Sequence, residues 1–225
     1  MAVTVESVLD GAAELLGDGE HAQFSTGTLL GKLKIAIEDL QEKLLEISSV
    51  RLNTRSDAIT VPADTSEVPL DTLEDMIEPI ALFTKVDNEY FREVDPEMWE
   101  RSEGGEARII DRALPYVYAW SWRENKIFIN KVVNDVEVIV RYRKALSTPL
   151  GENSNIDFPR TKLFLQYQTA GLVAEFDGEN PTRAQSLYAK ANMAWEEYSG
   201  IEIKSRQAVP IVKRGFGGLG RRRRR

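Results

Sequence analysis

The hydrophobic pattern of this chain changes its period twice, and this change constrains the fold more than any other feature. Over residues 4–16 and 26–47, apolar side chains recur every three or four positions, as on one face of an α-helix. Between residues 58 and 142, short apolar runs and alternating apolar residues replace that spacing, as in β-strands. Helical spacing returns from Pro159. The order predicts two helices, a β-rich insertion and two further helices.

The first two helices have clear boundary signals. Gly17-Asp18-Gly19 is predicted to end the helix over residues 4–16, because glycine accepts the left-handed conformation of a helix exit. Ser25 or Thr26 can cap the second helix. Its apolar positions form one stripe: Leu29, Leu33, Ala36, Leu40, Leu44 and Ile47.

The middle of the chain contains several candidate strands. The segments 58–62 and 79–83 are apolar runs broken by proline, which suits edge or terminal strands. Residues 116–122, 126–129 and 136–142 are predicted to form an antiparallel meander, with turns at 123–125 and 134–135. Asp95 to Arg101 is predicted to form a short helical turn, with Asp95 as its cap and Pro96 at its first position.

The second helix pair is predicted to form an antiparallel hairpin, because few residues connect the two helices. The first helix starts at Pro159 and ends at Asp177-Gly178, with Leu163, Tyr167, Ala170 and Ala174 on one face. The second starts at Asn180-Pro181 and continues to Gly200. Its apolar positions are Ala184, Leu187, Ala191, Ala194 and Tyr198.

These elements predict an α+β fold that is mainly α. Residues 1–55 and 151–202 supply two helix pairs of one bundle, and residues 56–150 form a β-rich insertion that projects from it. Periodicity disappears from about Lys204, and four glycines lie within residues 215–220. We therefore expect residues 203–225 to form an extended basic tail.

Charge divides the chain sharply at Glu202. Residues 203–225 carry nine of the 29 basic residues and no acidic residue, so residues 1–202 hold 20 bases against 36 acids, a net charge of −16. An acidic body with a basic tail indicates a protein that associates through that tail. The tail can bind an acidic groove on a protein or the phosphate backbone of a nucleic acid. A nucleic-acid reader normally presents a basic folded surface as well, which this acidic body does not favour.

Composition excludes several classes of function. Cysteine is absent and His21 is the single histidine, so thiol catalysis, cysteine metal sites and multi-histidine zinc sites are excluded. No apolar run approaches the roughly 18 residues of a membrane span. The residues preceding Glu6 show neither a basic nor an apolar signal-peptide region. We expect neither enzymatic activity, nor a cofactor, nor a metal site, nor a membrane partner.

The remaining motifs are interpreted as structural features rather than functional sites. Gly215 to Gly220 matches the G-x-G-x-x-G spacing of a dinucleotide loop, but no helix can follow it before residue 225, so a flexible hinge is favoured. His21 is expected to be exposed in a loop, and Ser25 to cap a helix. The acidic residues Asp71, Glu74, Asp75, Glu78, Glu196 and Glu197 are interpreted as solvated faces rather than an acid–base pair. The aromatic residues Trp120, Trp122, Phe128 and Tyr142 could stack on bases, but alternation favours a place in the core.

The element order, the segment 58–62 and the segment Leu73-Glu74-Asp75-Met76-Ile77-Glu78-Pro79-Ile80-Ala81-Leu82-Phe83 together resemble phage adaptor proteins. These are head–tail connector subunits, including tail accessory factors of short-tailed phages, that lie beneath the portal. The resemblance covers most of residues 1–200. It implies a helical core with a β insertion, assembled as a ring of twelve copies that joins capsid to tail in the virion, after synthesis in the host cytoplasm.

The resemblance also implies partners. These are the portal protein, tail or nozzle proteins, other copies of the chain, and DNA that passes through the ring without specific binding. Because the tails of such adaptors extend onto the portal, the portal-binding residues are expected in the tail: Val209, Ile211, Val212, Arg214, Phe216, Leu219, Arg221, Arg222, Arg223, Arg224 and Arg225. The alternative function is a nucleic-acid-binding protein that acts through its arginine-rich tail. A third, an enzyme that uses the carboxylates, has no recognisable motif.

Overall fold

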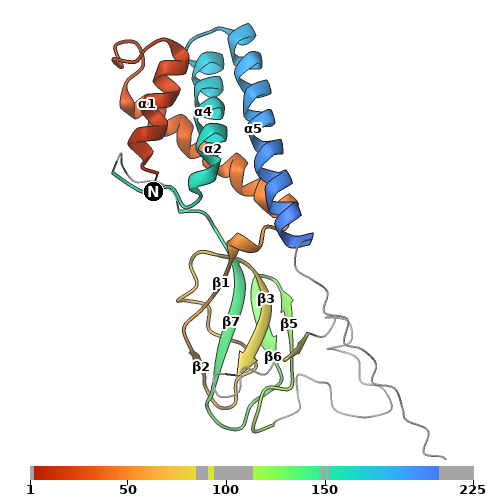
Figure 1. The fold of residues 1–225 in the computed structure, drawn as a ribbon. Coiled ribbons are helices and arrows are strands. Elements are labelled where there is room, and N and C mark those ends of the chain that lie inside the picture. The colour runs from red at the N-terminus through yellow and green to blue at the C-terminus, as the bar shows by residue number, and fades with distance from the viewer. Residues whose placement is uncertain (1–2, 85–90, 94–113, 148–150, 152, 208–225) are drawn as a thin grey trace, which may run out of the picture.

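The computed structural model describes residues 3–84, 91–93, 114–147, 151 and 153–207. Within these ranges the chain forms a helical bundle with a β module at one end of it (Figure 1). The β module lies between the two helix pairs in the sequence and projects from them in space. The predicted α+β fold, mainly α, is confirmed. The helices of the bundle are α1 (Val5–Leu16), α2 (Thr26–Glu46), α4 (Lys162–Phe176) and α5 (Pro181–Gln207).

Local signals set the end of α1 and the starts of α2 and α5 as the sequence predicts. The Thr4 side chain accepts a hydrogen bond from the backbone of Ser7, and Gly17 ends α1 in the left-handed conformation at φ +74°. The Ser25 hydroxyl accepts from the backbone of Thr28 and caps α2. Asn180 accepts from the backbone of Arg183 at 3.0 Å and caps α5.

Helix α4 occupies the centre of the bundle, where it packs against α1, α2 and α5. A helix with three neighbours is buried on several sides, so a single apolar face does not describe α4. Phe164 and Leu165, next to each other in the sequence, are both buried, whereas Leu163 is 55% exposed. The predicted face is therefore correct at Ala170 and Ala174 and wrong at Leu163.

Helix α5 runs to Gln207 rather than ending at Gly200. Glycine lowers helix propensity by about 1 kcal/mol but does not end a helix whose following turn is held by tertiary contacts. The prediction of an extended chain from residue 203 is therefore wrong for residues 203–207. Residues 208–225 of the predicted tail lie outside the described residues, as does the helical turn predicted at 95–101.

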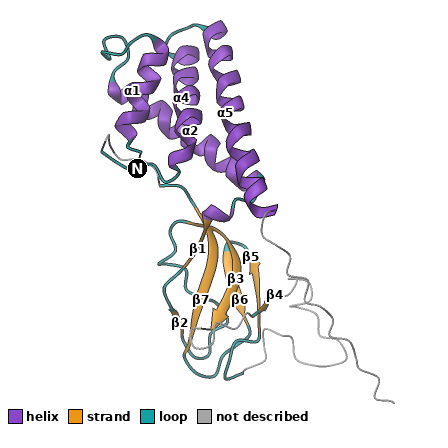
Figure 2. Cartoon of the chain, viewed as in Figure 1, coloured by secondary structure: helices purple, strands orange, loops and turns teal. Residues whose placement is uncertain are grey.

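The β module contains two sheets (Figure 2). A short 3₁₀ helix, η1 (Val50–Leu52), leads from α2 into β1 (Asn53–Arg55), so β1 lies inside the range assigned above to helices. The first sheet is organised by β7 (Val136–Lys144), which pairs antiparallel with β1, β2 (Ile59–Val61) and β3 (Met76–Thr84). The second sheet contains β4 (Arg92–Glu93), β5 (Ala119–Arg123) and β6 (Lys126–Ile129). Among the described strands β3 pairs only with β7, and its register shifts at Pro79, but the Phe91 N–H donates to the Leu82 carbonyl at 3.0 Å, so the edge expected for the segment 79–83 is partly occupied.

The predicted meander is correct for two strands and wrong for the third. Strands β5 and β6 form a hairpin, and Glu124 and Asn125 have positive φ angles of 52° and 57°, as a type I′ turn requires. Strand β7 joins the other sheet. The free edge of β6 is taken instead by the segment after β2, where the Val68 N–H donates to the Ile127 carbonyl at 3.0 Å.

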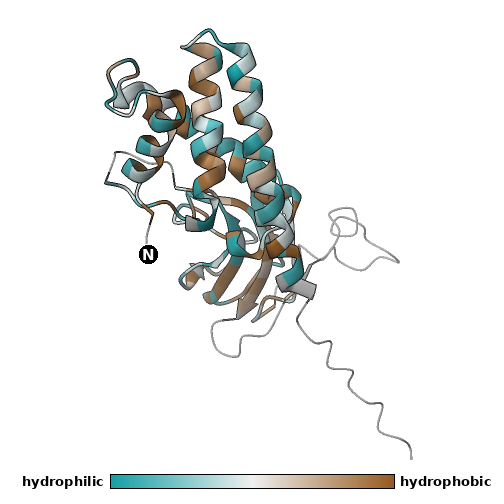
Figure 3. Ribbon diagram, turned by 45° about the horizontal axis from the view of Figure 1, so that its top comes forward, coloured by the Kyte–Doolittle hydropathy of each residue, from teal (hydrophilic) through white to brown (hydrophobic). Residues whose placement is uncertain are grey.

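The two sheets enclose a core separate from that of the bundle. Inward-facing residues of β7 meet residues of β5 and β6 there: Val138, Val140, Tyr142, Trp120, Ile127 and Ile129. Trp120, Phe128 and Tyr142 are buried, and Trp122 packs against this core. The aromatic residues are therefore structural, as their alternation predicts. In Figure 3, both hydrophobic and hydrophilic residues occur along the helices of the bundle.

Candidate partner-binding site at the root of the tail

The predicted portal-binding residues lie outside the residues that the structure describes. They are Val209, Ile211, Val212, Arg214, Phe216, Leu219, Arg221, Arg222, Arg223, Arg224 and Arg225. The glycine-rich segment 215–220 lies there too. What the structure does place is the last turn of α5, from which this segment continues. That turn lies beside η1, where the bundle meets the β module (Figure 1).

A buried carboxylate ties the end of α5 to this junction. Glu202 is only 3% exposed, and one of its oxygens lies 3.0 Å from Nε of Arg51. The hydroxyl of Ser49, itself fully buried, donates to the other oxygen at 3.0 Å. Ser49 and Arg51 belong to the short segment that leads from α2 into β1. The contact therefore joins the last turns of α5, the end of α2 and the start of the β module.

A buried carboxylate is tolerated here because charged and hydrogen-bonding partners surround it. Removing a carboxylate from water is costly unless such partners replace the lost hydration. Sequence reasoning missed this role and treated Glu202 only as the last acid before the basic tail. The signal was present, because Ala191, Trp195, Tyr198 and Glu202 follow one another at helical spacing and the first three are apolar. An acid on an apolar stripe indicates a buried partner.

An acidic groove of about 330 Å³ lies between α2, α4 and α5. Its acidic side chains come from α2, and Gln168 of α4 donates to Asp39 at 2.7 Å. Tyr188 of α5 donates to Glu175 at 2.6 Å, and burial, reinforced by that carboxylate, raises the pKa of the Tyr188 phenol. The groove is lined by Asp39, Glu42, Lys43, Glu46, Gln168, Tyr188 and Asn192. It can accept a cationic segment, and the Tyr188 phenol in its lining keeps its proton because its pKa is raised.

The structure separates the carboxylates that the sequence groups together. Asp75 accepts a hydrogen bond from the Tyr142 hydroxyl at 2.8 Å, and burial together with Asp75 raises the pKa of Tyr142 to about 12. Glu78 forms an ion pair with Arg143. The other members of the groups, Asp71, Glu74, Glu196 and Glu197, are exposed. The contacts of Asp75 and Glu78 link neighbouring segments of the β module, and they do not form an acid–base pair across a cleft.

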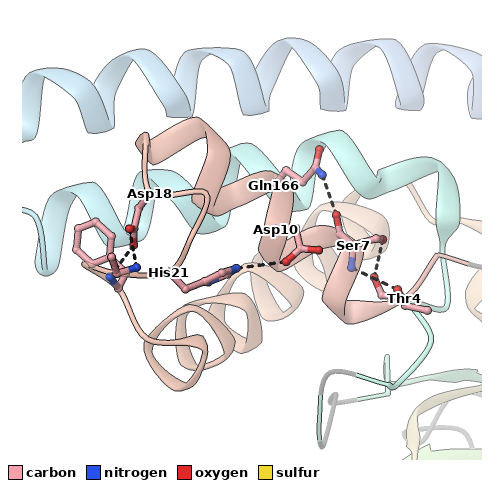
Figure 4. Close-up of polar contacts among 8 residues, drawn as sticks. Thr4, Ser7, Asp10, Asp18, His21 and Gln166 are labelled. Atoms are coloured by element: carbon pink, nitrogen blue, oxygen red, sulfur yellow. Dashed lines mark hydrogen bonds and ion pairs between the residues drawn. The ribbon is translucent and has the colours of Figure 1, made fainter.

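His21 lies in the α1–α2 loop, as the sequence predicts, but it is not simply exposed (Figure 4). Its side chain is 24% exposed, and Nε2 lies 3.3 Å from a carboxylate oxygen of Asp10. In the same loop the Asp18 carboxylate accepts backbone N–H groups of Ala22, Gln23 and Phe24, and these hydrogen bonds lower the pKa of Asp18. The loop is thus ordered around a carboxylate in the manner of a structural turn.

The described residues contain no group of three potential metal ligands. None of the described helices is long and apolar enough to cross a membrane. The chain matches no protein-family model and no curated protein sequence.

Proposed function

We propose that this protein is a head–tail adaptor of a bacteriophage virion. It forms a ring below the portal protein, joins the capsid to tail or nozzle proteins, and surrounds the channel through which the genome leaves. Its resemblance to phage adaptors and its order of helix pair, β insertion and helix pair support this function. The observation that carries the proposal is at the end of α5: Glu202 fixes this helix to the junction, and nine basic residues follow Glu202 in the sequence.

The acidic body suits a channel for DNA. A net charge of −16 over residues 1–202 repels phosphate groups, and like charge suppresses the counterion-releasing contacts by which proteins hold DNA. DNA can move through a channel only if the channel wall binds its phosphates weakly. The same charge disfavours the alternative of a nucleic-acid-binding protein, in which only the tail would hold the polyanion.

The tail supplies the attachment to the portal. Its apolar side chains, such as Val209, Ile211 and Phe216, each contribute on the order of 1.5–3 kcal/mol when fully buried. An exposed ion pair made by one of the terminal arginines contributes about 0–1 kcal/mol. Modest affinity for each tail becomes strong attachment in a ring, because every bound tail raises the effective concentration of the others.

Electron microscopy of the full chain mixed with the portal protein of the same genome tests this function. We expect rings of the chain stacked coaxially on portal rings. The adaptor function would be contradicted if the full chain does not bind the portal but binds short duplex DNA with an affinity that falls steeply as salt rises. That result would support the nucleic-acid alternative.

A further inference from the structure

Two arginines lie directly opposite each other on the outer face of the first sheet. In the register of β1 and β7, Arg55 pairs with Arg141. The neighbouring β7 residues Val140 and Tyr142 point into the core of the β module, so Arg141 lies on the opposite face. Arg55 is exposed and Arg141 is partly exposed. The pair therefore presents two positive charges side by side on a sheet surface.

No acidic group of the described residues compensates this pair. The Arg55 guanidinium lies 4.9 Å from the centre of the Phe83 ring, which holds it in place. The Arg141 side chain makes no ion pair or hydrogen bond within the described part of the chain. By contrast Arg143, two residues along the same strand, is paired with Glu78. Like charges directly opposite in an antiparallel pair destabilise a sheet. An anion placed between the two guanidiniums would remove that repulsion and form charge-assisted hydrogen bonds with both.

The same molecule carries an uncompensated feature of the opposite sign. Glu38, Glu42 and Glu46 are exposed at successive i, i+4 positions on α2, and Glu42 and Glu46 also line the acidic groove described above. Like charges at this spacing destabilise a helix by a few tenths of a kcal/mol per pair. None of the three forms an ion pair with another described residue. We call these three residues the α2 acidic ridge.

We propose that the Arg55–Arg141 pair binds the α2 acidic ridge of a second copy of this chain. Two bodies of charge −16 repel each other, so close packing of copies requires a local contact between opposite charges. The basic pair and the acidic ridge lie on different parts of one molecule, the β module and the bundle. In a ring the contact is heterologous: the pair of one copy meets the ridge of the next, and each copy keeps a free pair or a free ridge for a further neighbour. This inference rests on the self-assembly that the adaptor function requires, and it names the residues responsible.

Sedimentation velocity of the full chain and of variants with reversed charges, at low and high salt, tests the contact between the Arg55–Arg141 pair and the α2 acidic ridge. We expect the wild type to assemble at low salt. The variant Arg55→Glu/Arg141→Glu should raise the dissociation constant about tenfold or more, and Glu42→Lys/Glu46→Lys should do the same. Combining all four substitutions reverses both charges and should restore assembly at least in part. Salt should weaken the wild-type contact, because exposed charges are screened.

Arg160→Glu provides the matched control, because Arg160 is exposed and lies outside the β module, and it should leave assembly unchanged. Melting temperatures of all variants separate lost assembly from lost folding.

Any of three results would overturn the inference: undiminished assembly of Arg55→Glu/Arg141→Glu, no rescue by the four combined substitutions, or a wild type that stays monomeric at low salt. If the basic-pair variant still assembles on portal rings as the wild type does, the inference fails and the adaptor function stands. If self-assembly depends on these residues but the chain does not bind the portal, the adaptor function fails and the inference stands.

Discussion

At the scale of single residues, Glu202 has the largest structural consequence for the proposed function. Its carboxylate contacts Ser49 and Arg51, which belong to the segment between α2 and the β module. No local preference of α5 requires an acid there, since an acid near the end of a helix opposes the helix dipole. The tertiary contact is therefore the reason that this position carries a glutamate.

Substituting Glu202 should weaken the junction. Hydrogen bonds to charged groups contribute about 1.5–3 kcal/mol, so Glu202→Ala should lower the free energy of unfolding by about that amount. Chemical denaturation followed by circular dichroism measures it. Glu196→Ala, which changes an exposed acid of the same helix, should stay within about 0.5 kcal/mol of wild type. Equal effects of the two substitutions would contradict the role of Glu202.

Tyr142 should make the protein sensitive to alkaline pH. Burial and Asp75 raise its pKa to about 12 in the folded state, against about 10 in an unfolded chain. Between these values the unfolded chain releases the phenolic proton while the folded chain keeps it. Stability is therefore fully retained below pH 10 and falls as pH rises from 10 towards 12.

Denaturation midpoints measured from pH 9 to 12 test this dependence. The fall should be shallower for Tyr142→Phe, which has no phenol at that position. Tyr116→Phe, which changes an exposed ring, is the control for the loss of one phenol from the chain. Equal slopes for Tyr142→Phe and wild type would show that the buried hydroxyl has no part in the alkaline loss of stability.

At the scale of elements, helices could be predicted better than sheets. The ends of α1 and α2 depend on nearby residues, Thr4, Gly17 and Ser25, so the sequence determines them locally. The partner of β7 depends on which strand edges remain free. Residues after β2 already cover β6, a contact between segments far apart in the chain that periodicity does not reveal. The end of α5 was missed for the same reason, because Glu202 acts through residues more than 150 positions away.

The hairpin of α4 and α5 depends on a close approach at Gly171. A Cβ atom placed there would lie 2.6 Å from the Tyr188 ring, so Gly171→Ala forces the ring or the helix to move. We expect it to lower the free energy of unfolding by about 1–3 kcal/mol. Thermal denaturation of the variant measures the effect.

Gly200→Ala is the matched control in α5. No atom lies within 4 Å of its Cβ position, and alanine favours a helix interior. It should stabilise the chain by about 0.4–1 kcal/mol. A destabilising Gly200→Ala, or a neutral Gly171→Ala, would contradict this account of the hairpin.

At the scale of the whole molecule, charge distribution rather than a pocket suggests the function. The sequence alone predicted the acidic body and the basic tail. It could not predict that Arg55 and Arg141 lie opposite each other, because strand register decides this and the two residues are distant in the chain. Nor could it place the root of the tail at the junction, since that depends on the buried contact of Glu202.

The body without its tail should not bind DNA. Residues 1–207 retain all 36 acids and 22 of the 29 bases, so lowering salt should increase their repulsion from a polyanion. Fluorescence anisotropy with short duplex DNA at low salt measures this directly. Micromolar binding by residues 1–207 would contradict the proposal of a channel that DNA passes without specific contact.

The central claim, that the tail attaches an independently folded body to the portal, is tested most directly by deleting residues 208–225. The cut follows the last turn of α5 and leaves the Glu202 contact intact. Recruitment to purified portal rings, measured by co-sedimentation of full-length and truncated chains, gives the answer. We expect the truncated chain to keep its melting temperature and lose recruitment, and Phe216→Ala to weaken recruitment more than any single Arg→Ala within 221–225. A truncated chain that assembles on the portal as well as the full chain would contradict the account.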